Sequence, residues 1–432
     1  MSDTPKVSVI IPVYNVEPYL RQCMDSVVGQ TLREIEILCV NDGSTDVSPD
    51  ILREYAGRDG RIRLLSQHNQ GSAAARNRAI EQATGEYLIC WDSDDYFEPD
   101  ALEQMYTLAK RHDADLCLCN AQDFDDLSGK KLAHSYLRKP YPETDYFCWR
   151  DCPDRIFEFT STVCWNKMVR RRFLLDNDIR YQEAQYIEDT VAAILMLTLA
   201  KRIVLCKKKL VYYRVNRSGS QLANYGEQPE AIIRCCEETY DILARRDLLQ
   251  DEVLRQSLFD KFAGLYFRMA QHCGSFTQFE ALYRGILAGD SLLARYQPQE
   301  PVPRYLQMYR DTKEQSAGEY LFRRFRTLTE ANQELRAEAV DVKKKRKKLA
   351  QQLDETRSAL AASEAARQTV TEELVALEQR LADAKCALNA AEAGRKHAEL
   401  ALAEVRRSRA FRLGRLLTWL PRNICERLRK RK

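Results

Sequence analysis

The stretch Val7-Ser8-Val9-Ile10-Ile11-Pro12-Val13 decides the fold, because it is a short run in which almost every residue is apolar. Uninterrupted apolar runs of this length are typical of strands buried on both faces of a sheet. Similar runs recur along the first third of the chain, and helix-like stretches separate them. This alternation predicts an α/β fold, with a mostly parallel sheet flanked by helices. The predicted strands are residues 7–13, 35–40, 62–66 and 87–91, and the predicted helices are residues 18–30, 49–56 and 72–83.

Polar residues gather directly after two of these strands. Asn41-Asp42-Gly43-Ser44 follows the second strand, and Asp92-Ser93-Asp94-Asp95 follows the fourth. Open α/β sheets bind their ligands outside the carboxyl ends of their parallel strands. We therefore expect a ligand site at this edge of the sheet.

Sequence motifs of the first half of the chain point to a family. Seven segments occur in order at plausible spacing: V-S-V-I-I-P-V-Y-N-V-E-P-Y-L from Val7, S-V-V-G-Q-T from Ser26, E-I-L-C-V-N-D-G-S-T-D from Glu36, N-Q-G-S-A-A-A-R-N from Asn69, G-E-Y-L-I-C-W-D-S-D-D from Gly85, W-N-K-M from Trp165 and I-E-D-T from Ile187. Together they resemble the family 2 glycosyltransferases, which have a GT-A fold. The resemblance covers roughly residues 5–225. It implies transfer of a sugar from a nucleotide-sugar donor, with a UDP-sugar favoured.

Asp92 and Asp94 form a D-x-D motif. Residues two apart on an extended chain point the same way, so both carboxylates can face one site. Hard oxygen ligands suit Mg²⁺ or Mn²⁺, and the crowded acids invite a cation. A plain solvated loop is the alternative. The residues alone leave open which of Asp94 and Asp95 binds the metal and which binds the ribose. The resemblance favours Asp94 as a metal ligand, together with Asp92.

Donor-binding candidates lie after the first two strands and in the third helix. Asp42 can accept a hydrogen bond from a base N–H, and the resemblance implies that it reads a uracil-type edge. The alternative is an Asx-turn residue. Pro12, Tyr14 and Asn15 would line the same cleft. Arg76 can bridge to the acidic motif or to the donor phosphates, or form only a surface ion pair.

The segment Ile187-Glu188-Asp189-Thr190 opens an apolar helix. A carboxylate there can take the proton of the acceptor hydroxyl, and a single displacement then inverts the configuration of the sugar. The resemblance implies that Asp189 is this base, with Glu188 as a substitute. The alternative is a carboxylate that only favours the helix N-terminus.

Two further groups of candidates follow from the resemblance. Trp165, Asn166 and Lys167 would help to shape the acceptor pocket, although an aromatic residue at this position could equally be core. Arg214 belongs to a segment similar to the family's closing segment, where it would reach the diphosphate.

The second half of the chain is organised differently. We expect a helical extension over residues 226–325. Residues 328–405 then contain a seven-residue repeat that continues for eleven heptads. Seventeen of its 23 seam positions are apolar, which is typical of a coiled coil and indicates a homo-oligomer. A single solvated helix is the alternative.

Charge is divided unevenly along the chain. The total is +4, but residues 406–432 alone carry +10, so residues 1–405 carry −6. The tail interleaves Arg with Leu, Phe and Trp, which predicts a basic amphipathic segment bound to an anionic membrane surface. Nucleic-acid binding by an Arg-rich tail is the rival interpretation, and the apolar residues at helical spacing disfavour it.

Composition and the absence of certain motifs exclude several classes of protein. A hydrophobic fraction of 45% excludes wholesale disorder. Fourteen cysteines without a C-x-x-C pair indicate a reduced, cytoplasmic protein, here held at the inner face of the membrane. Neither a dinucleotide-binding glycine motif nor a P-loop motif occurs.

The sequence therefore predicts a metal-dependent inverting glycosyltransferase that extends a glycan or lipid-linked acceptor in cell-surface polysaccharide synthesis. A coiled-coil scaffold carrying an inactive glycosyltransferase-like domain is the alternative, and the intact acidic residues argue against it.

Overall fold

The computed structural model describes residues 4–182, 188–217, 229–273, 275–287, 291–312, 316–320, 341–353 and 367–407, together with positions 323, 326, 327, 330 and 334. The chain divides into two compact units. One comprises Met1–His272 and Ala281–Arg310, and the other comprises Cys273–Glu280 and Asp311–Lys432. The predicted membrane-binding tail lies outside the described residues from position 408 onward.

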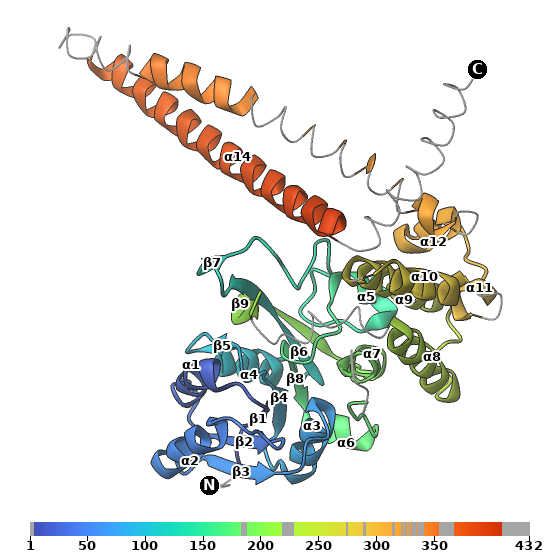
Figure 1. Ribbon diagram of the computed structural model, residues 1–432. Coiled ribbons are helices and arrows are strands. Elements are labelled where there is room, and N and C mark those ends of the chain that lie inside the picture. Colours follow the sequence, from blue (N-terminus) through green and yellow to red (C-terminus); the bar gives the residue numbers. More distant parts are fainter. Residues whose placement is uncertain are drawn as a thin grey trace, which may run out of the picture. The chain divides into compact units, whose positions relative to one another are not determined.

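The first unit is built on a nine-stranded sheet with the order β3-β2-β1-β4-β8-β6-β9-β5, and β7 pairs with β6 (Figure 1). The four predicted strands form β1 to β4, which confirms the α/β class. The strands are β1 (Val7–Val13), β2 (Ile35–Asn41), β3 (Ile62–Ser66), β4 (Tyr87–Cys90), β5 (Tyr96–Phe97), β6 (Leu116–Asp125), β7 (Lys130–Lys131), β8 (Lys167–Arg170) and β9 (Ile203–Val215).

The sheet is parallel in its first half and mixed in its second. Val7 of β1 lies beside Ile35 of β2 and Tyr87 of β4, and both pairings are parallel. β8 then runs antiparallel to β4 and β6, while β9 is parallel to β6. Every residue of β1 and β4 is buried, as their apolar runs predict.

Helices cover the sheet on both faces. α1 begins with Pro18 in its first turn and buries Leu20, Cys23, Met24 and Val27, which recur at the spacing of one helical face. α3 packs on β1 and β2, and α4 packs on β6 and β9. The helices of this part are α1 (Glu17–Val28), α2 (Ser48–Arg58), α3 (Ser72–Gln82), α4 (Ala101–Arg111), α5 (Ile156–Phe159), α6 (Arg171–Asp176) and α7 (Asp189–Leu199), with a 3₁₀ turn at Trp149–Asp151.

The helical region that follows begins in the same compact unit as the sheet. α8 packs against α7, and α9 packs against α5 and α8. α7 is buried along nearly its whole length, since helices and sheet surround it. The remaining helices are α8 (Pro229–Arg245), α9 (Glu252–His272), α10 (Phe276–Leu287), α11 (Leu292–Arg295), α12 (Arg304–Thr312) and α14 (Arg367–Arg407).

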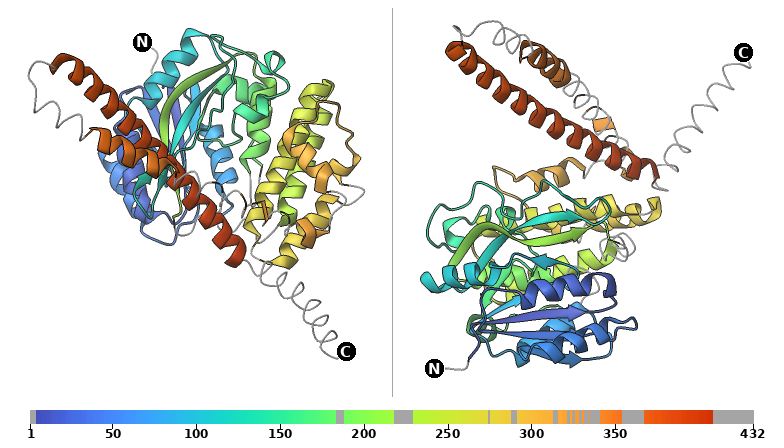
Figure 2. Two further views of the ribbon diagram at one scale, coloured as in Figure 1. Left: turned by 90° about the horizontal axis from the view of Figure 1, so that it is seen from above. Right: turned by 90° about the vertical axis from the view of Figure 1, so that its left-hand side faces the viewer.

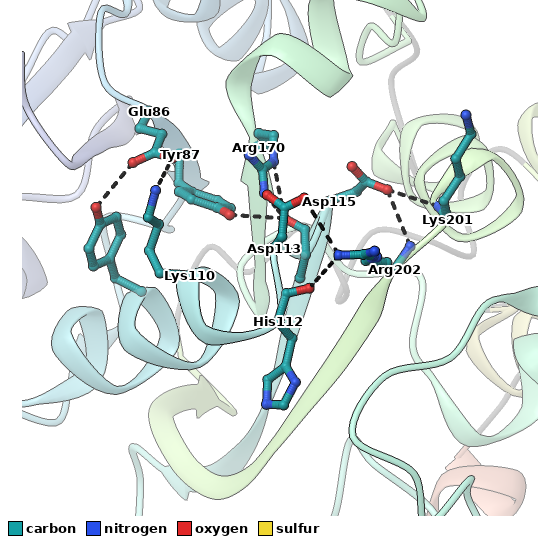
Figure 3. Close-up of polar contacts among 11 residues, drawn as sticks. Glu86, Tyr87, Lys110, His112, Asp113, Asp115, Arg170, Lys201 and Arg202 are labelled. Atoms are coloured by element: carbon teal, nitrogen blue, oxygen red, sulfur yellow. Dashed lines mark hydrogen bonds and ion pairs between the residues drawn. The ribbon is translucent and has the colours of Figure 1, made fainter.

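At the edge of the sheet where the parallel strands begin, charged side chains form ion pairs and hydrogen bonds within the protein (Figure 3). The ammonium of Lys110 lies 2.8 Å from the Glu86 carboxylate, and the guanidinium of Arg170 lies 2.6 Å from the Asp113 carboxylate. The Asp115 carboxylate accepts hydrogen bonds from two backbone amides of the turn before β9, at 2.9 and 3.2 Å. Each acid at this edge therefore has its own donor.

The second unit contains the long helix that the heptad repeat predicts. An earlier part of the repeat forms another helix that lies antiparallel to it. α14 runs antiparallel beside a helix over residues 341–353 in both Figure 1 and Figure 2, and Lys343 approaches Glu392 at 3.8 Å. Leu353, Leu388 and Leu402 are buried. Two parts of the repeat thus lie side by side within one chain, whereas a coil between chains stays a prediction. Within the residues that the structure describes, no helix is both long and apolar enough to span a bilayer.

Candidate active site

The predicted site residues meet at the edge where the parallel strands end. Pro12 is buried inside β1, and Tyr14 and Asn15 follow that strand. Asn15 adopts a positive φ of 48°, and its Oδ1 accepts a hydrogen bond from the backbone of Thr45 at 2.8 Å. Tyr14 is 45% exposed. The turn after β1 is thereby tied to the turn after β2.

The Asp42 carboxylate is buried and holds the segment that opens α3. It accepts hydrogen bonds from the Gln67 side chain at 2.8 Å and from the backbone amides of Gln70 and Gly71 at 2.9 and 2.8 Å. The side chain that holds the turn of this loop is that of Asn41, whose Oδ1 accepts from Ser44 N at 3.0 Å. Asp42 is therefore more than a turn residue, although its contact with a base stays a prediction.

Arg76 joins the acidic motif to the start of α7. Its guanidinium lies 2.8 Å from Asp92 Oδ1 and 3.3 Å from Glu188 Oε1, and the Ser72 hydroxyl also donates to Glu188. Arg76 is 4% exposed. The surface ion pair that the sequence left open is therefore wrong, because this arginine is buried between two carboxylates from distant parts of the chain.

Burial and crowding raise the pKa values of two acids in this motif. The pKa of Asp92 rises to about 6, mainly through burial, while Arg76 opposes the rise and the charges of Asp94 and Asp189 add to it. The pKa of Asp95 is also raised well above its usual range, again by burial first. Asp95 Oδ1 accepts the backbone N–H of Arg214 at 2.7 Å, and its Oδ2 has no partner among the described residues.

Arg214 is buried, and its guanidinium binds two side chains and one backbone carbonyl of the protein. Its guanidinium lies 2.5 Å from Asp126, donates to Gln22 at 2.6 Å and donates to the Asp94 carbonyl at 2.8 Å. The neighbouring Arg217 pairs with the Asp94 carboxylate. The sequence interpretation missed Arg217, although it lies in the same closing segment as Arg214, and it missed Asp126, which no motif marks. The fold brings both residues close to the acidic motif.

Asp189 begins α7 beside the buried W-N-K segment. Its carboxylate accepts the backbone N–H of Cys164 at 3.0 Å. Trp165 is 2% exposed and stacks on Tyr213, with ring centroids 5.1 Å apart. Tyr136, which the sequence interpretation also missed, meets Trp165 edge-on at 4.7 Å. An aromatic cluster of Tyr136, Trp165 and Tyr213 therefore lies close to Asp189.

Lys167 and Asn166 follow Trp165 in the chain and are buried. The Lys167 ammonium donates to the carbonyls of Ser161 and Val163 at 2.6 and 2.7 Å and to Asn166 Oδ1 at 2.9 Å. Asn166 donates to the carbonyl of Cys119 at 3.1 Å. Burial lowers the pKa of Lys167 to about 8. Both residues lie 1–2% exposed, so their contact with an acceptor stays a prediction.

The acidic motif fits a divalent cation. Burial is the main cause of the raised pKa of Asp92, the charges of Asp94 and Asp189 add to it, and a bound cation would favour the ionised carboxylate against both effects. Among the described residues no cluster of three or more potential ligand side chains forms. Mg²⁺ and Mn²⁺ in nucleotide sites need only one or two carboxylates, because water and phosphate oxygens complete their coordination. Asp92 and Asp94 meet that requirement.

A mixed α/β sheet with an acidic cluster at the ends of its parallel strands defines the GT-A class of fold. The family model for "Glycosyl transferase family 2" matches residues 8–165. The uncharacterized glycosyltransferase YibD of Escherichia coli (strain K12) is 31% identical over 273 residues, which cover 60% of this chain and 78% of YibD. The chain therefore belongs to family 2 of the glycosyltransferases.

Two further proteins are similar to this chain. The putative glycosyltransferase EpsH of Bacillus subtilis (strain 168) is 37% identical over 224 residues, which cover 50% of this chain and 62% of EpsH. The chain thus spans less than two thirds of that relative. A solved structure of the mannosyltransferase PcManGT from Pyrobaculum calidifontis, in complex with GDP-Man and Mn²⁺, aligns with a TM-score of 0.45 at 18% identity, covering 67% of this chain and 77% of that one.

Proposed function

We propose that this chain transfers a sugar from a nucleotide-sugar donor, a UDP-sugar being favoured, to a hydroxyl of a glycan or lipid-linked acceptor, with inversion at the anomeric carbon. The observation that carries the proposal is the bridge from Asp92 through Arg76 to Glu188, which sets Asp189 beside the acidic motif. Membership of the family supports the reaction class.

The donor would lie across the ends of β1, β2 and β4. The exposed Tyr14 and the adjacent Asn15 would contact the nucleoside, and the buried Pro12 would line the same cleft. Asp42 would accept from the base. Its Oδ2 receives a single protein hydrogen bond, and a carboxylate oxygen can accept more than one.

Asp94 and Asp92 would hold Mn²⁺ or Mg²⁺. When bound, such an ion neutralises charge on the leaving diphosphate. The Asp95 carboxylate holds the backbone of Arg214 and the Asp94 carboxylate pairs with Arg217, so the choice of Asp94 rests on the family resemblance. Arg76 keeps Asp92 oriented, while Arg214 donates to the Asp94 carbonyl and Arg217 pairs with the Asp94 carboxylate.

Asp189 would act as the general base. Its carboxylate receives a backbone N–H from Cys164, whereas the Glu188 carboxylate is already held by Arg76 and Ser72. This difference supports Asp189 as the base and leaves Glu188 to position Arg76. A single displacement needs no covalent intermediate, so one carboxylate is sufficient.

The site of action would be the cytoplasmic face of the membrane, in cell-surface polysaccharide synthesis. The basic amphipathic tail of residues 406–432 motivates this, and the heptad repeat would join copies of the chain. Deletion of residues 406–432 should abolish pelleting with anionic vesicles. A truncated chain that still pellets would show that the tail is not the anchor.

The reaction is tested by donor hydrolysis with a panel of UDP-sugars and Mn²⁺. The wild-type chain should turn over at least one donor, and Asp94→Ala should not. Absence of both turnover and binding with every donor would sink the proposal. Turnover that is equal with and without a metal chelator would remove its metal-dependent part.

A further inference from the structure

A buried carboxylate outside the motifs of the site has an oxygen without a partner. Asp123 on β6 is 9% exposed, and its Oδ1 makes no hydrogen bond with any described residue. Its Oδ2 lies 2.9 Å from His134 Nδ1, although the two atoms do not form a hydrogen bond. Buried polar atoms in native proteins are nearly always hydrogen-bonded. The free oxygen of Asp123 therefore calls for a ligand or for an ordered water.

The segment that carries His134 is held along β6. The backbone N–H of Leu132 donates to the Asp123 carbonyl at 2.9 Å, and that of Tyr136 donates to Asn120 Oδ1 at 2.9 Å. Between these two anchors, the rings of His134 and Tyr136 meet edge-on at 4.5 Å. Burial first, and then the charge of Asp123, raises the pKa of Tyr136 above its ordinary value. Asp123, His134 and Tyr136 therefore lie together beside the strand.

The sheet places Asp123 on the face that carries the aromatic cluster. Asp123 of β6 lies opposite Tyr213 of β9, and such neighbours extend from the same face of a sheet. The next pair, Phe124 and Arg214, extends from the other face, because side chains alternate along a strand. Asp123 thus shares the face of Tyr213 and not that of Arg214.

Ring contacts lead from His134 toward the proposed base. Tyr136, which contacts His134, meets Trp165 edge-on at 4.7 Å. The residue before Trp165 is Cys164, whose backbone N–H donates to the Asp189 carboxylate at 3.0 Å. An acceptor that presents a hydroxyl to Asp189 would extend along these rings toward the carboxylate oxygen that has no partner.

We propose that Asp123 and His134 bind a second hydroxyl group of the acceptor, remote from the one that receives the sugar, and thereby position the acceptor at Asp189. The inference rests on the proposed function and assigns residues to its acceptor side. Aromatic side chains with a few placed polar groups are typical of small-molecule sites. An ionised carboxylate only accepts hydrogen bonds, so the group bound there must donate one, as a sugar hydroxyl does.

The test measures binding of a panel of neutral methyl glycosides to the full-length chain by ligand-observed NMR, with UDP and Mn²⁺ present. At least one glycoside should bind to the wild type. D123L removes both acceptor oxygens and keeps a similar branched shape. It should raise the dissociation constant about 10-fold or more, since hydrogen bonds to charged groups have effects of this size. D123N keeps one acceptor oxygen and should lose less affinity.

D50L is the matched control, because it makes the same change at an exposed aspartate of α2. This helix packs on β3, which lies at the other end of the sheet order from β6 and β9. The dissociation constant of the glycoside should therefore stay within about twofold of the wild-type value. An equal loss of affinity in D50L and D123L would contradict a specific role for Asp123.

Urea unfolding of the chain without glycoside separates ligand binding from a purely structural role. A carboxylate that serves the fold through an ordered water stabilises it, so D123L would then lower the urea midpoint. Removal of a buried oxygen without a partner should leave the midpoint unchanged or raise it. A lower midpoint would overturn the inference. So would glycoside binding that D123L leaves unchanged, or the absence of binding by every glycoside to the wild type.

Donor hydrolysis by the wild type is measured separately, and it distinguishes the two proposals. Hydrolysis of a donor, without the expected effect of D123L on glycoside binding, contradicts this inference alone. Glycoside binding that D123L weakens, without turnover of any donor by the wild type, contradicts only the proposed function.

Discussion

The two edges of the central sheet carry similar residue types and use them in opposite ways. At the edge of Glu86, Asp113 and Asp115, every acid is paired with a nearby donor, and most of the pairs are partly exposed. At the edge of Asp92 and Asp95, the acids are buried and crowded, and their pKa values are raised. The first arrangement contributes only to the stability of the fold. The second leaves an unbalanced charge, which is what a ligand site requires.

Strand β8 shows the difference within four residues, because it spans both edges. Lys167 at its first position is buried at the site edge, with the pKa lowered to about 8. Arg170 at its last position is at the opposite edge and pairs with Asp113 at 2.6 Å. Equal positive charges on one strand therefore have different energetic roles.

The largest effect should come from the proposed base. Asp189→Asn should lower the rate of sugar transfer about 10³-fold, since general bases contribute factors of this size. Glu86→Gln, a matched carboxylate change at the opposite edge, should leave the rate within about twofold. Steady-state release of the nucleoside diphosphate measures both. Equal loss in the two variants would mean that the edges do not differ in function.

Arg76→Met should destabilise the protein by about 4 kcal/mol. The change leaves Asp92 and Glu188 buried without their shared cation, and broken buried pairs cost about 3–5 kcal/mol. Urea unfolding measures the loss. Because Asp92 would also bind Mn²⁺, added Mn²⁺ should restore part of the loss. A loss below about 1 kcal/mol would contradict the burial of this pair.

Lys167 should make stability depend on alkaline pH. Its folded-state pKa is about 8, below the ordinary value of 10.5, so the unfolded chain binds more protons between these values. Stability should therefore rise as pH increases from about 8 to 10.5, by on the order of 2 kcal/mol. Lys167→Met should lose this rise. Urea midpoints at pH 7.5, 8.5 and 9.5 in both chains provide the comparison, and parallel curves would refute it.

The smallest effect should come from the opposite edge. Lys110→Met removes a partly exposed ion pair with Glu86, and such pairs contribute about 1 kcal/mol or less. The free energy of unfolding should fall by no more than that, and the difference should shrink at 1 M salt. A loss as large as that of Arg76→Met would remove the energetic contrast between the edges.

The parallel half of the fold was predictable because its strands are buried on both faces. The predicted runs 7–13 and 62–66 coincide with β1 and β3, and the run 35–40 falls one residue short of β2. β9 was missed because three consecutive lysines, Lys207 to Lys209, interrupt its apolar pattern. Its pairing with β6 is also non-local, and no local sequence signal specifies it.

The site was predictable in composition and only partly in geometry. The order of the motifs predicted Asp92, Asp94 and Asp189 as site residues, and their roles stay predictions. Adjacent aspartates look alike in a sequence. Only the fold shows that Asp95 turns inward to hold the backbone of Arg214. Arg217 pairs with Asp94, which lies 123 positions earlier in the chain, and only the fold shows that contact.

The bridge made by Arg76 also sets an order of events during synthesis of the chain. Arg76 and Asp92 are 16 residues apart, but Glu188 lies 112 residues beyond Arg76. Contacts of such separation form late, because the loop must close before the contact stabilises it. The first four strands can pair while α7 is still being made. The nascent chain would then hold its donor-side half in place before it has a base, so it would become able to transfer sugar only once the helix that carries Asp189 has docked.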